Sequence, residues 1–206
     1  MLCALNQNGS FETQEEINAK WTKSTLTYSI KSGTGDFDKL RTALNLAMTS
    51  WDIEIPIKLK YVKENSDITL EFSTTDKYFL DSPGVLAYAY FPNSGSLSGK
   101  IVFNDNYLWS IDGKAITGEE YMKRTGKQVS DPTNFFATYN ILHTLTHEIG
   151  HSLGLVHSGF KDDVMYPFYN KVVILTDNDI ARIQNKYGKA SNNKRLKEWL
   201  KRRLSR

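Results

Sequence analysis

A chain of 206 residues with 40% hydrophobic and 12% aromatic residues is long enough for one domain with a sizeable core, with or without appendages. Its single cysteine, Cys3, excludes an internal disulfide. The sequence contains no run of about 18 apolar residues, so we expect no transmembrane helix. The net charge of +3 is uneven, because residues 189–206 hold eight Lys or Arg and one Glu, a charge of +7, which leaves −4 for the rest. We therefore expect a mildly acidic globular part and a strongly basic tail.

The first third of the chain predicts a mixed sheet with one helix on one face. Apolar and polar residues alternate in three short stretches, the pattern of half-buried strands. These strands are expected at residues 25–30, 57–61 and 68–72. Between the first two, apolar residues from Leu40 to Trp51 recur at helical spacing, and Asp36 can cap that helix. The order strand, helix, strand, strand indicates a mixed sheet.

The middle of the chain predicts two more strands and an insertion. A turn at Asp81-Ser-Pro-Gly84 precedes a strand at residues 85–90. A flexible loop rich in Asn, Ser and Gly, residues 93–99, then leads to a strand at 101–103. Residues 111–131 are hydrophilic and contain three glycines, so we interpret them as an insertion with one short helix.

Two further helices are predicted in the last third. The first is capped at residues 133–134 and runs to about Leu153. The second begins after Thr176, which forms the pattern of a capping box with Asp179 three residues later, and it stops at Gly188.

The first of these helices ends in the pattern His-Glu-Ile-Gly-His-Ser-Leu-Gly-Leu-Val-His, which holds three of the four histidines. His147 and His151 are four residues apart and share one helix face, from which two imidazoles reach one zinc ion. Glu148 points to the side of that pair and can accept a proton from a zinc-bound water. Gly154 can adopt a left-handed conformation that ends the helix, so that His157 approaches the ion from another direction. Three nitrogen ligands leave a fourth position open, as in catalytic zinc sites.

This extended pattern also resembles a known family. A bare His-Glu-x-x-His can arise by chance, but the glycine and third histidine at fixed offsets make coincidence a weak alternative. The pattern is similar to the long zinc signature of the metzincin peptidases. Downstream, Asp163-Val-Met-Tyr-Pro167 resembles their methionine turn in the form found in matrixins, the matrix metalloproteinases. In such a turn Met165 forms an apolar floor beneath the metal and is not a ligand.

The resemblance covers about residues 20–188 and implies a fold. We expect the α/β (α+β) class: a metzincin-like zincin with a twisted, mixed five-stranded sheet, a long active-site helix and a C-terminal helix after the methionine turn. Residues 1–19 would then form an N-terminal arm, and residues 189–206 a basic tail that we expect to be helical.

The resemblance also implies an activity. It is that of a zinc-dependent metalloendopeptidase, in which the three histidines hold one catalytic zinc ion and Glu148 is the general base for hydrolysis of peptide bonds. Leu86 and Ala87 on the edge strand would bind an extended peptide, and Pro167 and Tyr169 would wall the pocket for the side chain after the cut. Ordinary core and turn roles for Leu86 and Pro167 remain open as alternatives.

Substrate, assembly and location follow from the same resemblance. The apolar stretch Val172-Val-Ile174 favours a hydrophobic residue after the scissile bond. We expect a monomer that acts on protein or peptide substrates. The resemblance implies a secreted, extracellular protein, while the start of the chain, Met1 to Leu5, is too short for a signal-peptide core.

The chain departs from the matrixin pattern at a second, structural zinc site. Tyr88, Val102 and Thr74 stand where that family has histidines, and only Asp76 remains of the ligand set. We therefore expect no structural zinc.

The family's calcium site is also reduced. Asp81 remains, but Asn104 and Tyr107 replace carboxylates, although calcium prefers charged oxygen ligands. We therefore leave calcium binding open and favour its absence.

Two more residues allow competing interpretations. Cys3 lies about where a matrixin pro-segment would place its inhibitory cysteine, but an ordinary N-terminal cysteine is favoured, since no flanking motif residues are present. His143 lies on the same helical stripe as His147, and a second-metal role competes with ordinary packing. Packing is favoured, because no carboxylate or cysteine partner is evident nearby.

The basic tail and the overall function each leave alternatives open. Leu196, Trp199, Leu200 and Leu204 form an apolar stripe, which predicts either a helix that docks on an anionic membrane, nucleic acid or another polyanion, or a solvated terminal helix. Two alternatives to the endopeptidase interpretation remain. The protein could be a non-catalytic binding module that contains zinc, or an effector that is targeted by its tail and for which proteolysis is a secondary activity. The carboxylate of Glu148 argues against the first of these, because a structural zinc site does not need it.

Overall fold

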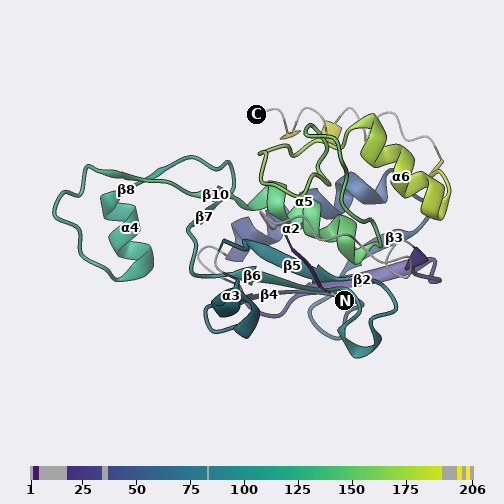
Figure 1. Ribbon diagram of the computed structural model, residues 1–206, viewed down its shortest axis with the longest axis horizontal. Coiled ribbons are helices and arrows are strands. Elements are labelled where there is room, and N and C mark those ends of the chain that lie inside the picture. The colour runs from purple at the N-terminus through teal and green to yellow at the C-terminus, as the bar shows by residue number, and fades with distance from the viewer. Residues whose placement is uncertain are drawn as a thin grey trace.

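The computed structural model describes residues 2–4, 18–33, 37–82, 84–191, 199–200 and 203–204. One large mixed sheet carries α2 (Phe37–Asp52), α5 (Ile141–Ser152) and α6 (Asp177–Tyr187) on one side, as Figure 1 shows. This arrangement confirms the expected α/β (α+β) class. No helix in the described ranges has both the length and the apolar character needed to cross a membrane.

The strands of the large sheet follow the order β1-β5-β6-β4-β2-β3. They are β1 (Leu2–Ala4), β2 (Thr25–Ile30), β3 (Lys58–Tyr61), β4 (Ile68–Ser73), β5 (Ala87–Tyr90) and β6 (Lys100–Asn104). The pairs β2-β3, β2-β4 and β4-β6 are parallel, whereas β5 is antiparallel to both β6 and β1. The five predicted strands are confirmed, and β1 adds a sixth within the segment that we expected to form the N-terminal arm. Because β1 pairs with Tyr88–Tyr90, β5 is not the edge strand that we expected.

The main core lies between this sheet and the pair α2 and α5. The apolar stripe of α2 is buried, as its helical spacing predicts. Its buried members are Leu40, Ala43, Leu44, Ala47, Met48 and Trp51. The Nε1 atom of Trp51 donates a hydrogen bond of 2.9 Å to the backbone oxygen of Thr146 in α5, which fixes the two helices against each other. The expected cap of α2, Asp36, lies outside the described residues.

Gly150 allows α5 to approach its neighbours closely. A Cβ atom at this position would lie 2.3 Å from the Sδ atom of Met165 and 3.1 Å from Cζ2 of Trp51. Both neighbours are fully buried, so neither side chain has free space to move into. A side chain at position 150 would therefore push the methionine turn away from the helix.

We expect Gly150→Ala to destabilise the protein by about 1–3 kcal/mol through overpacking, measured by urea unfolding. The matched control is Gly159→Ala, since nothing lies within 4 Å of a Cβ built at that position. This control should change stability by no more than about 0.5 kcal/mol. Equal stability of the two variants would contradict the packing argument.

The C-terminal helix α6 begins as the sequence predicts. The Thr176 hydroxyl accepts a hydrogen bond from the backbone nitrogen of Asp179, and the Asp179 carboxylate accepts one from the backbone nitrogen of Thr176, which completes a capping box. The helix ends at Gly188, where φ is 85°. The expected helix after the methionine turn is therefore confirmed.

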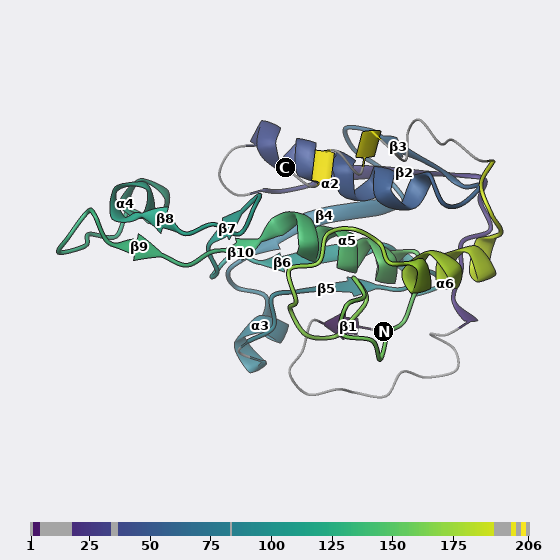
Figure 2. The same cartoon turned by 90° about the horizontal axis from the view of Figure 1, so that it is seen from above.

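The insertion forms a separate projection, seen at one end of the molecule in Figures 1 and 2. The predicted bounds, residues 111–131, hold β8 (Ile116–Thr117) and α4 (Gly118–Thr125), but the projection extends further and includes β9 (Phe135–Phe136). At its base β7 (Trp109–Ser110) pairs with β10 (Tyr139–Asn140). The ring of Tyr121 stacks on that of Phe136, with centroids 4.0 Å apart, and holds α4 against β9. The predicted single short helix is confirmed. Two short helices lie elsewhere, α3 (Lys77–Asp81) and η1 (Gly95–Leu97).

The predicted start of the active-site helix was wrong. Neither Thr133 nor Asn134 caps α5, because the nitrogen and hydroxyl of Thr133 bind the carboxylate of Asp131 in a local turn. The cap is Asn140, whose side chain accepts a hydrogen bond of 3.1 Å from the nitrogen of His143. Thr133 and Asn134 therefore lie in a turn, although residues of these types are suited to capping. Strands β9 and β10 follow this turn before α5 begins.

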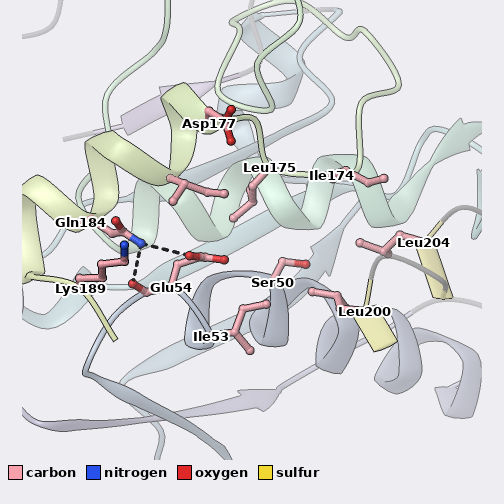
Figure 3. Close-up of a pocket in the computed structure, with 11 residues that line it drawn as sticks. Ser50, Ile53, Glu54, Ile174, Leu175, Asp177, Gln184, Lys189, Leu200 and Leu204 are labelled. Carbon is pink, nitrogen blue, oxygen red and sulfur yellow. Dashed lines mark hydrogen bonds between the residues drawn. The ribbon is translucent and has the colours of Figure 1, made fainter. Parts of the chain in front are cut away.

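The described part of the basic tail packs against the domain. Leu200 is buried and Leu204 is partly buried against the core, whereas Trp199 is half exposed. The two leucines help to line a cavity of about 290 Å³ between α2 and α6, shown in Figure 3. Across this cavity the Nε2 atom of Gln184 donates hydrogen bonds to the backbone and side-chain oxygens of Glu54. Part of the tail's apolar stripe thus faces the protein, while Leu196 lies outside the described residues.

Candidate metal centre

Two imidazoles from α5 and one from the following loop converge on one point. The ring centroids of His147 and His151 are 4.6 Å apart. The ring centroid of His157 lies 5.4 Å from that of His147 and 4.7 Å from that of His151. One nitrogen of each ring lies within 4.8 Å of the other two. The predicted ligand set is therefore assembled, with two members from one helix face and the third from another direction.

The hydrogen bonds of the two helix histidines fix which nitrogen faces this point. Nδ1 of His147 lies 2.7 Å from the backbone oxygen of Val164, and Nδ1 of His151 lies 2.6 Å from that of Leu155. A carbonyl oxygen only accepts, so both Nδ1 atoms carry the proton and both Nε2 atoms present lone pairs. The Nε2 atoms lie 2.9 Å apart. Two lone pairs at this distance repel each other, and a shared cation removes that repulsion.

Burial reinforces the preference for a metal over protons. It lowers the pKa values of His147 and His151 well below the usual range, and each is lowered further by the neighbouring histidines. Both rings are therefore neutral at physiological pH, the form that binds zinc. The donor set fits a zinc ion, since three imidazoles converge and two of them have a backbone carbonyl behind the ring.

The loop that delivers His157 depends on Gly154. Its φ is 92°, and a Cβ atom there would lie 2.1 Å from the backbone oxygen of Ala19. The chain reverses at this point, since the nitrogen of Leu155 donates to the oxygen of Gly150 at 2.8 Å. Arg182 of α6 then holds the loop by donating to the backbone oxygens of Val156 and His157, at 2.7 Å and 3.1 Å. The sequence pattern indicated the glycine but gave no signal for this arginine.

The methionine turn lies beneath the centre and is fixed from α6. Met165 is fully buried, and its backbone oxygen accepts a hydrogen bond of 2.7 Å from the nitrogen of Ser158. The carboxylate of Asp179 accepts from the backbone nitrogens of Val164 and Met165, at 2.9 Å and 3.3 Å. Asp179 was predicted only as a helix cap. It also orients the turn whose carbonyl, at Val164, supports His147.

Asp163 joins the same turn to the start of α6. Its carboxylate accepts hydrogen bonds from the side chains of Ser158, Thr176 and Asn178. Burial alone raises the pKa of Asp163, but these three donors lower it overall. The carboxylate therefore stays charged and bridges both sides of the His157 loop.

Glu148 is the notable exception to this pattern of satisfied polar groups. Its side chain is fully buried, and neither carboxylate oxygen has a partner among the described residues. Burial raises its pKa well above the usual value for glutamate. A buried carboxylate without a partner is unfavourable unless a cation, a water or a ligand faces it. This orphaned group next to the three imidazoles is the position expected for a general base.

The four predicted substrate residues lie on either side of the centre. Leu86 and Ala87 are buried at the start of β5, and Ala87 pairs with Phe103 of β6. Pro167 and Tyr169 are half buried after the methionine turn. The hydroxyl of Tyr169 accepts a hydrogen bond of 2.7 Å from the nitrogen of Asn140. Their roles in substrate binding stay predictions.

His143 is packed and lies outside the triad. It is fully buried, its Nδ1 atom lies 2.5 Å from the backbone oxygen of Val172, and its ring is 6.4 Å from that of His147. Burial lowers its pKa to about 4, so the ring is neutral at pH 7. These contacts favour the packing interpretation of this residue over a second-metal role.

The position that matrixins use for a structural zinc carries a different set of contacts. The hydroxyl of Tyr88 donates a hydrogen bond of 2.7 Å to Asp76, and burial and this bond raise the pKa of Tyr88. Val102 packs against Tyr88 in a small apolar cluster that also contains Phe79 and Val85. Tyr88, Asp76 and Val102, which stand at the metal-ligand positions of matrixins, are thus held together by a hydrogen bond and by apolar packing.

The residues at the expected calcium positions have other partners. Asp81 forms an exposed ion pair with Lys77. The Nδ2 atom of Asn104 donates to the backbone oxygen of Val85 at 3.0 Å, and Tyr107 packs edge-on against an aromatic ring of β10. In the part of the chain that the structure describes, the histidine triad is the only group of three His, Cys, Asp or Glu residues placed to hold an ion.

The fold and the three-histidine centre together define the metzincin class of zinc peptidases. The chain belongs to the matrixin family, whose model, described as Matrixin, matches residues 20–188. The match covers strands β2 to β6 of the large sheet, the insertion, α5, the methionine turn and α6.

Several matrix metalloproteinases are similar to this chain. It is 33% identical to matrilysin of Homo sapiens over 187 residues, which cover 85% of this chain and 61% of that protein. It is 33% identical to matrix metalloproteinase-26 of Homo sapiens over 192 residues, or 88% of this chain and 64% of that protein. Stromelysin-1 of Equus caballus is 31% identical over 198 residues, 90% of this chain and 36% of that protein. The chain thus spans about three fifths of matrilysin.

We expect His157→Ala to lose most of the bound zinc, because two imidazoles from one helix face hold the ion less well than three. Metal analysis of the purified protein measures this loss. The control is His143→Leu, which removes the fourth histidine and should leave one zinc per chain. A full zinc complement in His157→Ala would contradict its role as the third ligand.

We expect Tyr88→Phe to destabilise the protein by about 1 kcal/mol, because the Asp76 carboxylate loses a hydrogen bond from a buried donor. Asp76 also caps α3, so a double-mutant cycle with Asp76→Ala separates the Tyr88 interaction from the cap. A coupling energy of zero in urea unfolding would contradict the role given to this bond.

Proposed function

We propose that this protein is a zinc-dependent endopeptidase that hydrolyses peptide bonds in protein or peptide substrates. The observation that carries the proposal is the carboxylate of Glu148, which is buried without a hydrogen-bond partner among the described residues and follows the first of three convergent histidines in α5. A purely structural metal site gains nothing from such a group, whereas hydrolysis requires a base next to the metal. Membership of the matrixin family supports the same reaction.

The side chains have distinct roles in this reaction. His147, His151 and His157 hold one zinc ion, which when bound polarises water and lowers its pKa from about 15.7 towards 7. Glu148 accepts the proton of the attacking water and passes it to the nitrogen of the leaving group. The carbonyls of Val164 and Leu155 hold two of the imidazoles in the tautomer that binds the ion.

In this proposal the substrate lies along the outer side of β5, where it displaces β1 from Tyr88–Tyr90. An extended peptide adds to β5 through main-chain hydrogen bonds, with Leu86 and Ala87 facing it. Pro167 and Tyr169 form one wall of the pocket that receives the side chain after the cut. The apolar residues 172–174 favour a side chain with a substantial apolar part in that pocket.

Assembly and location are also proposed. We place the protein outside the cell as a monomer, on the resemblance of the whole domain to matrixins. The basic tail, through its many Lys and Arg, would add affinity for anionic surfaces or polyanions.

The experiment that tests the function is hydrolysis of casein and of a quenched fluorescent peptide. We expect the wild-type protein to cleave both, a chelator to abolish cleavage and added zinc to restore it. Glu148→Ala should keep its zinc but lower kcat by roughly 10²- to 10⁴-fold, because the general base is lost.

The matched control is Glu119→Ala, which removes an exposed glutamate of α4 far along the insertion and should leave kcat unchanged. Wild-type activity in Glu148→Ala would refute the assigned base. A zinc-loaded wild-type protein that cleaves no polypeptide would leave a metal-binding module as the function.

A further inference from the structure

The third metal ligand is held differently from the other two. His147 and His151 are fully buried in α5, where the helix fixes their backbone. His157 is half buried and lies in residues 155–158, which form neither helix nor strand. Irregular backbone is mobile unless other contacts hold it. The contacts around His157 therefore decide how well the triad is assembled before a metal ion arrives.

One of these contacts comes from α6 and carries a positive charge. Nη2 of Arg182 donates to the backbone oxygen of Val156 at 2.7 Å and to that of His157 at 3.1 Å. These two carbonyls belong to the peptide bonds on either side of the ligand, so the guanidinium holds both flanking peptide planes. Hydrogen bonds from an ionised donor are stronger than those between neutral groups.

The helix that carries Arg182 is a firm support. Ile183, the next residue, is fully buried in the main core. The carboxylate of Asp179 accepts from the backbone nitrogens of Val164 and Met165, at 2.9 Å and 3.3 Å, so α6 is also fixed to the methionine turn. The guanidinium thus reaches the His157 loop from a rigid element that is distant in the sequence.

A neighbouring carboxylate balances the charge of Arg182. Burial raises the pKa of Asp163, but hydrogen bonds from three side chains and the nearby charge of Arg182 lower it overall. The same carboxylate accepts from the hydroxyl of Ser158, the residue after His157. A cation and an anion therefore hold the loop on the two sides of the ligand. Because opposite charges offset each other, this guanidinium repels a metal ion less than an isolated cation would.

We propose that Arg182 is a positioning residue that sets the zinc affinity of this protein by preorganising His157. With both flanking peptide bonds held, the third imidazole loses less conformational freedom when the ion binds. The coupling is reciprocal, so bound zinc strengthens the packing of α6 against the His157 loop. The inference rests on the zinc site of the proposed function, but it requires no catalysis.

The test measures the Kd of zinc for the whole chain by competition with a chromophoric chelator. We expect Arg182→Ala to bind zinc roughly 10- to 100-fold more weakly than the wild type, as is typical when a group that orients a metal ligand is removed. The matched control is Arg41→Ala, which removes an exposed arginine of α2 that pairs with Asp38 and should leave the Kd unchanged. Unchanged affinity in Arg182→Ala would overturn the proposal.

Two further variants separate the hydrogen bonds of Arg182 from its charge. Arg182→Lys keeps the charge but replaces the planar, forked donor by a single ammonium, and Arg182→Gln is shorter and uncharged. We expect zinc affinity to fall in both variants, and less in Arg182→Lys. If the guanidinium acts mainly through its charge, the uncharged variants bind zinc more tightly, because a nearby cation repels the ion. Tighter binding in Arg182→Gln and Arg182→Ala would overturn the proposal.

A merely structural role gives a different result in thermal unfolding. If Arg182 only stabilises the fold, Arg182→Ala lowers the Tm of the metal-free and the zinc-loaded protein by the same amount, which would overturn the proposal. We expect the increase in Tm on addition of zinc to be smaller in the variant, because a ligand stabilises the folded state more when it binds more tightly.

Hydrogen exchange measures the reciprocal effect on α6. We expect zinc to slow the exchange of amides in residues 177–187 of the wild type, and to slow it less in Arg182→Ala. An equal effect of zinc on both proteins would contradict the coupling between α6 and the metal centre.

These measurements keep the inference separate from the proposed function. A wild-type protein that cleaves no polypeptide, but whose zinc affinity falls in Arg182→Ala, would refute the proposed activity and support the role of Arg182. A wild-type protein that binds no zinc would overturn both.

Discussion

The rest of the structure depends on the orientation of the imidazoles at the histidine centre by backbone carbonyls. Backbone carbonyls of Val164 and Leu155 fix the protons of His147 and His151 on their outer nitrogens, so the inner nitrogens face each other 2.9 Å apart without a proton between them. Much of the surrounding chain serves to keep this arrangement. Gly150 admits the methionine turn, Gly154 reverses the chain, and α6 holds both loops through a carboxylate and a guanidinium. A cation between the rings is what makes these constraints mutually favourable.

The other face of β5 and β6, away from the main core, carries a separate set of interactions. Tyr88 and Val102 occupy positions that hold zinc in the resembling family, and here they contribute a hydrogen bond to Asp76 and apolar contacts. A hydrogen bond of this kind stabilises by about 1 kcal/mol, much less than a structural zinc ion. The aromatic and aliphatic burial around Tyr88 supplies the rest. Side-chain packing therefore stabilises this face of the sheet.

The features predicted correctly from the sequence are those set by residues close together along the chain. The spacing of His147 and His151 places both on one helix face wherever the helix lies, and alternation predicted three of the five strands. The true cap, Asn140, was missed because its position depends on strand pairing and on Tyr169, which lies 29 residues away. Arg182 was missed for the same reason, since it acts on backbone oxygens 25 and 26 residues away. Such long-range contacts leave no local pattern in the sequence.

The pairing of β1 with β5 has an energetic consequence for any chain that joins the sheet there. Leu2–Ala4 already lies antiparallel along Tyr88–Tyr90, so the outer main-chain groups of that stretch have a resident partner. An arriving peptide that takes this stretch exchanges one set of backbone hydrogen bonds for an equivalent set, and the exchange is nearly neutral in free energy. The side chains of competing peptides then decide which of them binds. A peptide without a side chain that fits the protein gains no binding free energy by displacing β1.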